Sequence, residues 1–116
     1  MSTSNEKRQS QRYVLHRGSV ASINGTQTYS TVIDISENGL AFICAPELQH
    51  GDKIEIALEL KEEGNTKTFS VIVEVVRCLQ EDFEYQIGAI VKTITHEFKT
   101  LVEQIKRARM NYQAAV

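Results

Sequence analysis

Two short segments near the start of the chain carry side chains whose types and spacing suit the recognition of a small anion. In the first, Arg8 and Arg12 stand four positions apart, and each offers a guanidinium fork for phosphate oxygens or for the O6/N7 edge of guanine. In the second, Asp34, Ser36 and Gly39 share one predicted turn, where the carboxylate can accept hydrogen bonds from guanine N1–H and N2–H₂. Together the segments predict a site for a small, doubly charged guanine nucleotide.

Each segment has an ordinary explanation when it is taken alone. Arginines beside Lys7 can form a solvated basic patch, and Asp, Ser and Asn-Gly commonly bond to their own backbone in turns. The combination is more specific, because the arginines precede the first predicted strand and the turn follows the second. The 22 positions from Arg12 to Asp34 fit two strands and a tight turn. We therefore expect the two segments to meet at one end of the fold.

The strands that must position these segments follow from β-branched and alternating residues. We expect strands at residues 13–23, 28–35, 40–44, 53–60, 66–79 and 85–94. Asn24-Gly25 is the strongest hairpin signal in the chain, and further turns are expected at 36–39 and 62–65. Gly88, in the middle of the last strand, predicts a bulge or a close approach.

A change of period predicts one amphipathic helix near the end of the chain. Its apolar positions are Phe98, Leu101, Val102, Ile105 and Ala108. Thr95 is expected to cap this helix, Glu97 to suit the positive end of its dipole, and Met110 to mark the start of fraying. We divide the chain into a flexible N-terminal arm at 1–12, a barrel with its helix at 13–110 and a frayed tail at 111–116.

The whole reads as an all-β dominated fold, a six-stranded antiparallel β-barrel with a C-terminal α-helix, because closure removes exposed strand edges. The 116 residues allow one domain, and the net charge of −2 argues against binding to DNA or RNA. No apolar run is long enough for membrane insertion, and the polar start lacks a signal peptide, so we expect a cytoplasmic protein.

The sequence offers no constellation for catalysis or for metal binding. No Ser/His/Asp spacing, paired-carboxylate cleft or phosphate-binding glycine loop is present, so the chain is not expected to be an enzyme. Cys44 and Cys78 form no Cys-x-x-Cys pair and have no histidine beside them. We expect two reduced, packed thiols, with no metal and no cofactor.

With both motifs in place, the sequence resembles the PilZ domain family over roughly residues 7–109. The resemblance rests on Arg8-xxx-Arg12, on Asp34-x-Ser36-x-x-Gly39, and on the supporting Tyr85-x-Ile87-Gly88 strand before the helix. It implies a PilZ-type barrel that binds the bacterial second messenger cyclic di-GMP. By the same resemblance, the two arginines would hold phosphates and a guanine edge, the acid and the hydroxyl would hold the other guanine, and the last glycine of the turn motif would shape the turn.

Two further positions follow from this resemblance. Lys7 occupies a place where relatives vary and which influences whether one ligand or a stacked pair is bound. Many relatives carry an aromatic residue in the strand around residues 73–77, but this chain has no Trp, and Arg77 is a candidate to stack on a base in its place. An exposed arginine at a strand end is the alternative explanation for that residue.

The function implied is that of a cyclic di-GMP receptor. On ligand binding its arm would become ordered and the domain would act as an adaptor or effector on a partner protein, in the control of motility, biofilm or exopolysaccharide. The alternative is a PilZ-fold module for protein–protein interaction, for example in pilus assembly, that binds no nucleotide. The effector protein, the ligand stoichiometry, the affinity and the oligomeric state are left open by the sequence.

Overall fold

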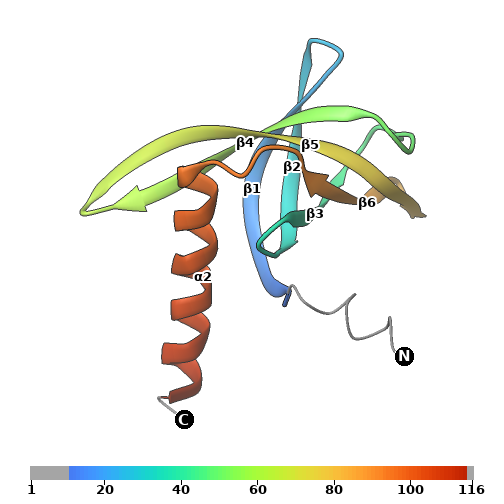
Figure 1. Ribbon diagram of the computed structural model, residues 1–116. Coiled ribbons are helices and arrows are strands. Elements are labelled where there is room, and N and C mark those ends of the chain that lie inside the picture. Colours follow the sequence, from blue (N-terminus) through green and yellow to red (C-terminus); the bar gives the residue numbers. More distant parts are fainter. Residues whose placement is uncertain (1–10, 115–116) are drawn as a thin grey trace, which may run out of the picture.

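The structure, a computed structural model, describes residues 11–114, and for residues 110–114 it describes the helical backbone alone. Six strands precede one helix (Figure 1). The elements are β1 (Tyr13–Ile23), β2 (Thr26–Ile35), β3 (Gly39–Cys44), β4 (Lys53–Glu62), β5 (Asn65–Glu81), β6 (Glu84–Val91) and α2 (His96–Ala114). Lys7, Arg8 and most of the predicted arm lie outside the described residues.

The strands close into a ring in the order β1-β2-β3-β6-β5-β4, with every neighbouring pair antiparallel. This confirms the predicted fold class, a six-stranded antiparallel barrel with a C-terminal helix. The ring is closed by a short ladder, because β1 and β4 pair only from Val20–Ala57 to Ser22–Glu55. Beyond these pairs the two strands diverge and leave an open seam.

Tight turns at the predicted dipeptides set the register of the long hairpins. Asn24 and Gly25 have φ angles of 51° and 83°, and Glu63 and Gly64 have the same values. Positive φ at both central residues is the signature of a turn whose twist matches that of the flanking strands. The strands therefore run directly into these turns, and most extend one or two residues beyond the predicted limits.

Several boundaries differ from those that the sequence predicts. The last strand ends at Val91 and not at Ile94, and Val91 donates its N–H to the carbonyl of Asn38 in the 36–39 turn. Between the last two strands, where the predicted limits leave residues 80–84, the ladder continues to Glu81–Glu84 and a tight turn joins β5 to β6, with Asp82 at a φ of 53°. The backbone of α2 continues to Ala114, beyond Met110.

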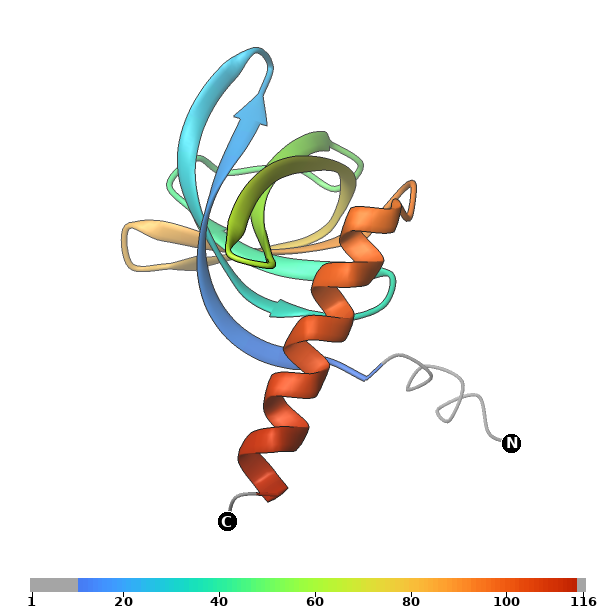
Figure 2. The same ribbon diagram turned by 90° about the vertical axis from the view of Figure 1, so that its left-hand side faces the viewer.

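The inward positions of the strands and one face of α2 form a single core. Phe98, Leu101, Val102 and Ile105 are each at most 7% exposed, and they pack with Phe42, Leu58 and their neighbours. Phe98 N–H donates to Thr95 Oγ1 over 3.2 Å, which confirms the predicted cap. The helix runs along one side of the ring (Figure 2), and no helix in the described part of the chain is long and apolar enough to span a membrane.

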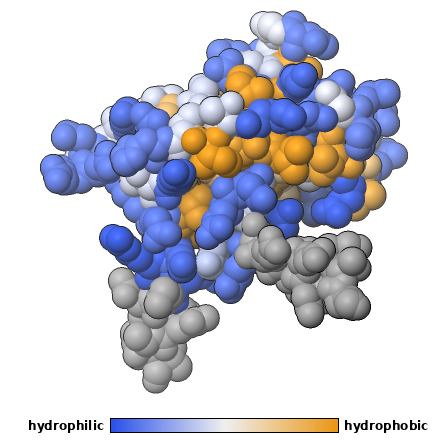
Figure 3. Space-filling view, viewed as in Figure 1, coloured by the Kyte–Doolittle hydropathy of each residue, from blue (hydrophilic) through white to orange (hydrophobic). Residues whose placement is uncertain are grey.

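The outer face of β5 and β6 also carries apolar side chains. Ile72, Val76, Leu79 and Ile90 are 42%, 42%, 51% and 43% exposed. In Figure 3 apolar residues gather as a band over these two strands, between polar margins. The only ion pair of this face in the described chain joins Glu74 to Lys92 over 2.9 Å.

Candidate functional site

An ion pair joins the two predicted binding segments. Arg12 Nη1 lies 2.6 Å from Asp34 Oδ1, and the two side chains are 51% and 24% exposed. The register of the first hairpin explains the contact, because Val14 of β1 pairs with Asp34 of β2 and Arg12 directly precedes β1. The hairpin thus brings a cation of the first segment to the acid of the second, as the spacing in the sequence predicts.

Ser36 faces the interior of its own turn. Its side chain is almost fully buried, and its Oγ lies 3.3 Å from Asn38 Oδ1 and 3.3 Å from the carbonyl oxygen of Gly39. Its N–H donates to the same carbonyl over 2.9 Å. The single hydroxyl proton can be given to one acceptor at a time, so in this conformation Ser36 holds the turn that follows Asp34.

Gly39 is needed for close packing between strands. A Cβ on this residue would lie 2.9 Å from the carbonyl oxygen of Ala89 in β6 and 3.6 Å from Ser36 Oγ. Neither Asn38 nor Gly39 has a positive φ, so this turn is built without left-handed backbone. Because it has no side chain, Gly39 lets the start of β3 lie close to the backbone of β6.

A row of paired residues crosses the outer face of the barrel from Asp34. Asp34 pairs with Ala41, Ala41 with Gly88, and Gly88 with Arg77. Ala41 is buried yet stands apart from the core cluster, and Gly88 has no side chain, so the middle of the row is low. With strands about 4.8 Å apart, the two charged ends are separated by about 14 Å of backbone.

Arg77 lies over Gly88 at the far end of this row. A Cβ on Gly88 would lie 3.3 Å from Arg77 Nη2 and 3.6 Å from both its Cβ and its Nε. The strand is irregular between Val75 and Arg77, which places Val76 and Arg77 on the outer face together. The close approach predicted from Gly88 is confirmed, and the irregularity lies opposite it, in β5. Ala41 and Gly88 form the low middle of the row, which we call its floor. The sequence did not indicate the part played by Ala41, because only the strand register shows it.

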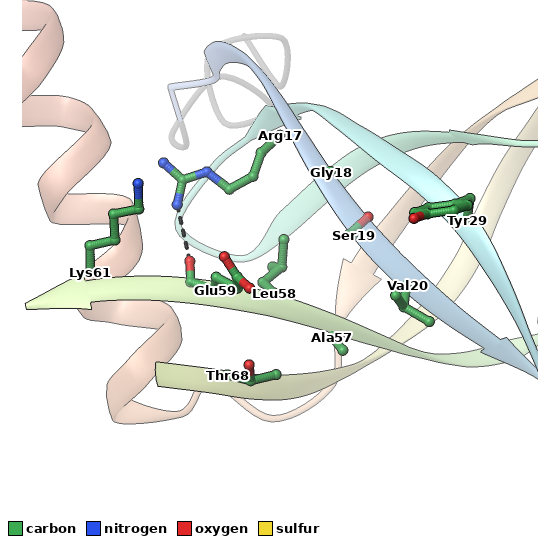
Figure 4. Close-up of a pocket in the computed structure, with 10 residues that line it drawn as sticks. All are labelled: Arg17, Gly18, Ser19, Val20, Tyr29, Ala57, Leu58, Glu59, Lys61 and Thr68. Carbon is green, nitrogen blue, oxygen red and sulfur yellow. Dashed lines mark hydrogen bonds between the residues drawn. The ribbon is translucent and has the colours of Figure 1, made fainter. Parts of the chain in front are cut away.

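Two cavities on the described part of the chain lie apart from this row. A cavity of about 540 Å³ opens at the β1–β4 seam, lined by Arg17, Tyr29, Lys61 and their neighbours (Figure 4). Arg17 reaches across the seam and donates from Nη1 to the carbonyl oxygen of Glu59 over 3.1 Å. A second cavity of about 590 Å³ lies between Glu37 and Asn38 of the turn and the first turns of α2.

The two cysteines are unpaired thiols in the structure. Burial raises the pKa of the Cys44 thiol to about 11, and the nearby Cys78 and Glu84 add to the effect. Cys44 Sγ lies 3.4 Å from the carbonyl oxygen of Pro46. Among residues 11–109, no group of three or more His, Cys, Asp or Glu side chains is placed to hold a metal ion.

Comparison with solved structures finds the same fold. The inhibitor of motility MotI (DgrA) of Bacillus subtilis superposes with a TM-score of 0.77 at 18% identity, over 90% of this chain and 52% of that one. The PilZ domain of Escherichia coli YcgR with c-di-GMP gives 0.70 at 10% identity, over 95% and 99%. The Klebsiella pneumoniae MrkH–c-di-GMP complex gives 0.61 at 21% identity, over 93% and 54%.

The chain thus spans about half the length of MotI and of MrkH, and almost the whole of the YcgR domain. At these identities the likeness concerns the fold. No curated protein sequence matches the chain significantly. The family model described as the PilZ domain matches residues 6–107. Because that match covers most of the sequence, and the closed ring of strands agrees with it, the chain belongs to the PilZ domain family.

Proposed function

We propose that this chain is a receptor for cyclic di-GMP, which it binds on the outer face of the barrel between Arg12, Asp34 and Arg77. The observation that carries the proposal is the 2.6 Å contact between Arg12 and Asp34, since it unites the two predicted segments at one place. The PilZ domain of YcgR and MrkH, two of the structural neighbours, were solved with c-di-GMP. The low floor between the charged ends offers room for a flat base against the sheet.

Binding would replace the Arg12–Asp34 ion pair by contacts to the ligand. A pair this exposed contributes roughly 0.2–1 kcal/mol. A charge-assisted hydrogen bond contributes about 1.5–3 kcal/mol, and the ligand offers several. The Asp34 carboxylate would accept from guanine N1–H and N2–H₂, while the guanidinium of Arg12 turns to a phosphate. The exchange therefore favours the complex, and the existing pair keeps both groups in place before the ligand arrives.

The remaining predicted residues have distinct parts in this proposal. Arg8 would supply the second guanidinium, and Lys7 would decide between one ligand and a stacked pair. Ser36 and Gly39 would act through the turn that presents Asp34. Folding the short segment that carries the two arginines onto the ligand fixes about five residues, at a cost of about 1–2 kcal/mol for each. That cost offsets much of the gain from the arginines, so we expect micromolar affinity, on the order of 8 kcal/mol.

Calorimetric titration with cyclic di-GMP tests the proposal. We expect heat of binding from the unchanged protein and a loss of affinity of at least about tenfold for Arg12→Ala and for Asp34→Ala. Arg17→Ala is the matched control, because Arg17 is a neighbouring arginine whose guanidinium contacts the Glu59 carbonyl across the seam. No heat from the unchanged protein, or equal binding by all three variants, contradicts the proposal.

We further propose that the chain binds the nucleotide without converting it and passes the signal to another protein as an adaptor or effector. Within residues 11–109 the Asp34 carboxylate is paired with the Arg12 guanidinium, which suits it to accept hydrogen bonds from a bound base. Recovery of intact cyclic di-GMP after long incubation with the protein is the expected result. Accumulation of a linear dinucleotide would instead indicate an enzyme.

A further inference from the structure

The tip of the β5–β6 hairpin exposes a large aromatic side chain. Phe83 is 94% exposed, and it has no place in the core cluster or among the residues packed against it. The hairpin projects from the ring on the side away from α2 (Figure 2). Full burial of a phenylalanine is worth about 1.5–3 kcal/mol, and this position forgoes that gain.

Acidic residues surround Phe83 on both sides. Glu81, Asp82 and Glu84 are all exposed, and none takes part in an ion pair within residues 11–109. The ladder continues to the last pair, so Glu81 stands directly opposite Glu84. Like charges in opposite positions destabilise a hairpin. Asp82 adds a left-handed backbone with a φ of 53°.

Two locally unfavourable features therefore meet within four residues: an exposed aromatic ring and a like-charge cross-strand pair. Residues chosen for stability alone would place Asn-Gly here, as the chain does at Asn24-Gly25. Local conflicts of this kind concentrate where a surface serves binding. The continuous ladder keeps the tip in a fixed position, so the ring is presented at low entropic cost.

We propose that this tip, residues 81–84, docks into an apolar pocket rimmed by Lys and Arg on a partner protein. Phe83 would fill the pocket as an aromatic anchor, and the rim would relieve the repulsion between Glu81 and Glu84. The negative charges of the tip disfavour binding to an anionic membrane or to a nucleic acid, because both are negatively charged. The tip lies about 13 Å along β5 from Arg77, so this surface is separate from the proposed nucleotide site and does not depend on it.

A photo-crosslinking residue placed at position 83 in the native cell tests the proposal. Position 29 is the matched control, because Tyr29 of β2 is 88% exposed and lies outside the hairpin. We expect one protein to be captured at position 83 in clear excess over position 29. That protein is then purified and its affinity for the full chain is measured. We expect Phe83→Ser to weaken binding by about tenfold or more, with cyclic di-GMP binding unchanged.

Charge reversal tests the cationic rim. Glu81→Lys with Glu84→Lys is expected to weaken the purified complex, and Glu62→Lys with Glu63→Lys, at the exposed tip of the β4–β5 hairpin, is expected to leave it unchanged. The proposal is overturned by equal capture at both positions, by capture of a second copy of this chain, by binding of Phe83→Ser at full affinity, or by co-sedimentation with anionic vesicles that depends on Phe83.

Discussion

The two small residues of the turn motif act on the backbone around them. Ser36 is buried with its hydroxyl against Asn38 and Gly39, and Gly39 lets the carbonyl of Ala89 approach. The Ser36 hydroxyl is engaged within its own turn, and Gly39 has no side chain that could contact a ligand. In this motif Asp34 can contact a ligand, while Ser36 and Gly39 fix the position of Asp34. A substitution of Ser36 or Gly39 should therefore first lower the stability of the fold.

Gly39→Ala is expected to destabilise the fold, because its Cβ would stand 2.9 Å from the Ala89 carbonyl oxygen. Overpacking against a fixed backbone typically costs about 1–3 kcal/mol. Urea unfolding measures the change. Gly18→Ala is the control, since a Cβ there meets nothing within 4 Å and the residue has no positive φ. Equal losses for both variants would show that the contact with β6 is not the cause.

Cys44 is expected to resist alkylation in the folded protein. Burial raises the pKa of its thiol to about 11, so the reactive thiolate is scarce at pH 7 to 9. Mass spectrometry after timed iodoacetamide treatment should show slow modification of Cys44 in buffer and rapid modification in denaturant. Modification of Cys44 in buffer at the denatured rate would rule out a protected thiol.

At the level of elements, side-chain hydrogen bonds hold β1 and β4 together where the backbone ladder between them ends. The β1–β4 ladder stops at Val20–Ala57, and beyond it Arg17 donates to the Glu59 carbonyl. From α2, Gln104 Nε2 donates to the carbonyl oxygen of Lys61 over 3.0 Å, and Arg109 donates to that of Val14. The helix is therefore tied to both edges of the open seam, as well as packed on the core. Val14 is also the partner of Asp34, so α2 and the candidate site share one stretch of β1.

The start of α2 carries a charge whose effect on stability depends on pH. A backbone hydrogen bond in the first turn and the ammonium of Lys67, 3.1 Å away, lower the pKa of Glu97 below its usual 4.5. A carboxyl group with a lowered folded-state pKa stabilises the fold above its unfolded pKa, and this contribution is lost as the pH falls through the folded value. Glu97→Gln should therefore lower stability at pH 7 and reduce the difference between pH 7 and pH 3.

Thermal unfolding at both values of pH checks this expectation. Glu103→Gln is the control on the same helix, because Glu103 is exposed and forms no ion pair within residues 11–109. The same change in pH dependence from both variants would mean that the first-turn position and Lys67 have no special part. A larger loss of stability from Glu97→Gln at pH 3 than at pH 7 would contradict a lowered pKa of the Glu97 carboxyl group.

At the scale of the whole molecule, local signals predicted the elements well. Asn24-Gly25 can adopt a turn with two positive φ angles whatever lies elsewhere in the chain, and Phe98 and Leu101 mark a helical face by their spacing alone. The barrel was predicted because closure removes exposed strand edges, but the order of the strands around the ring was not predicted. Contacts between strands distant in sequence fixed the rest: the row from Asp34 through Ala41 to Arg77 depends on a register that no local pattern encodes.

In the candidate site, too, local features were predictable from the sequence and contacts with distant strands were not. The meeting of Arg12 and Asp34 was predictable, because one hairpin separates them. The bonds of Ser36 within its own turn are the ordinary alternative that the sequence also offered. The contact of Gly39 with β6 was not predictable, because it depends on how the turn packs against a strand distant in the sequence. The end of the last strand was misplaced for a related reason: Val91 bonds to Asn38, and residues beyond it turn toward α2.

Ligand binding to the folded barrel should appear as a gain in the stability of the whole domain. A ligand that binds only the folded state adds roughly 2.7 kcal/mol at a concentration of about 100 times Kd. We therefore expect cyclic di-GMP to raise the melting temperature of the unchanged protein and of Arg17→Ala, and to raise that of Asp34→Ala clearly less at the same ligand concentration. Without ligand, Asp34→Ala should cost about 1 kcal/mol or less, because the pair that it removes is exposed. A large loss of stability in the ligand-free variant would mean that the ion pair serves the fold itself. An equal ligand-induced rise in Asp34→Ala and in the unchanged protein would place the nucleotide elsewhere on the barrel.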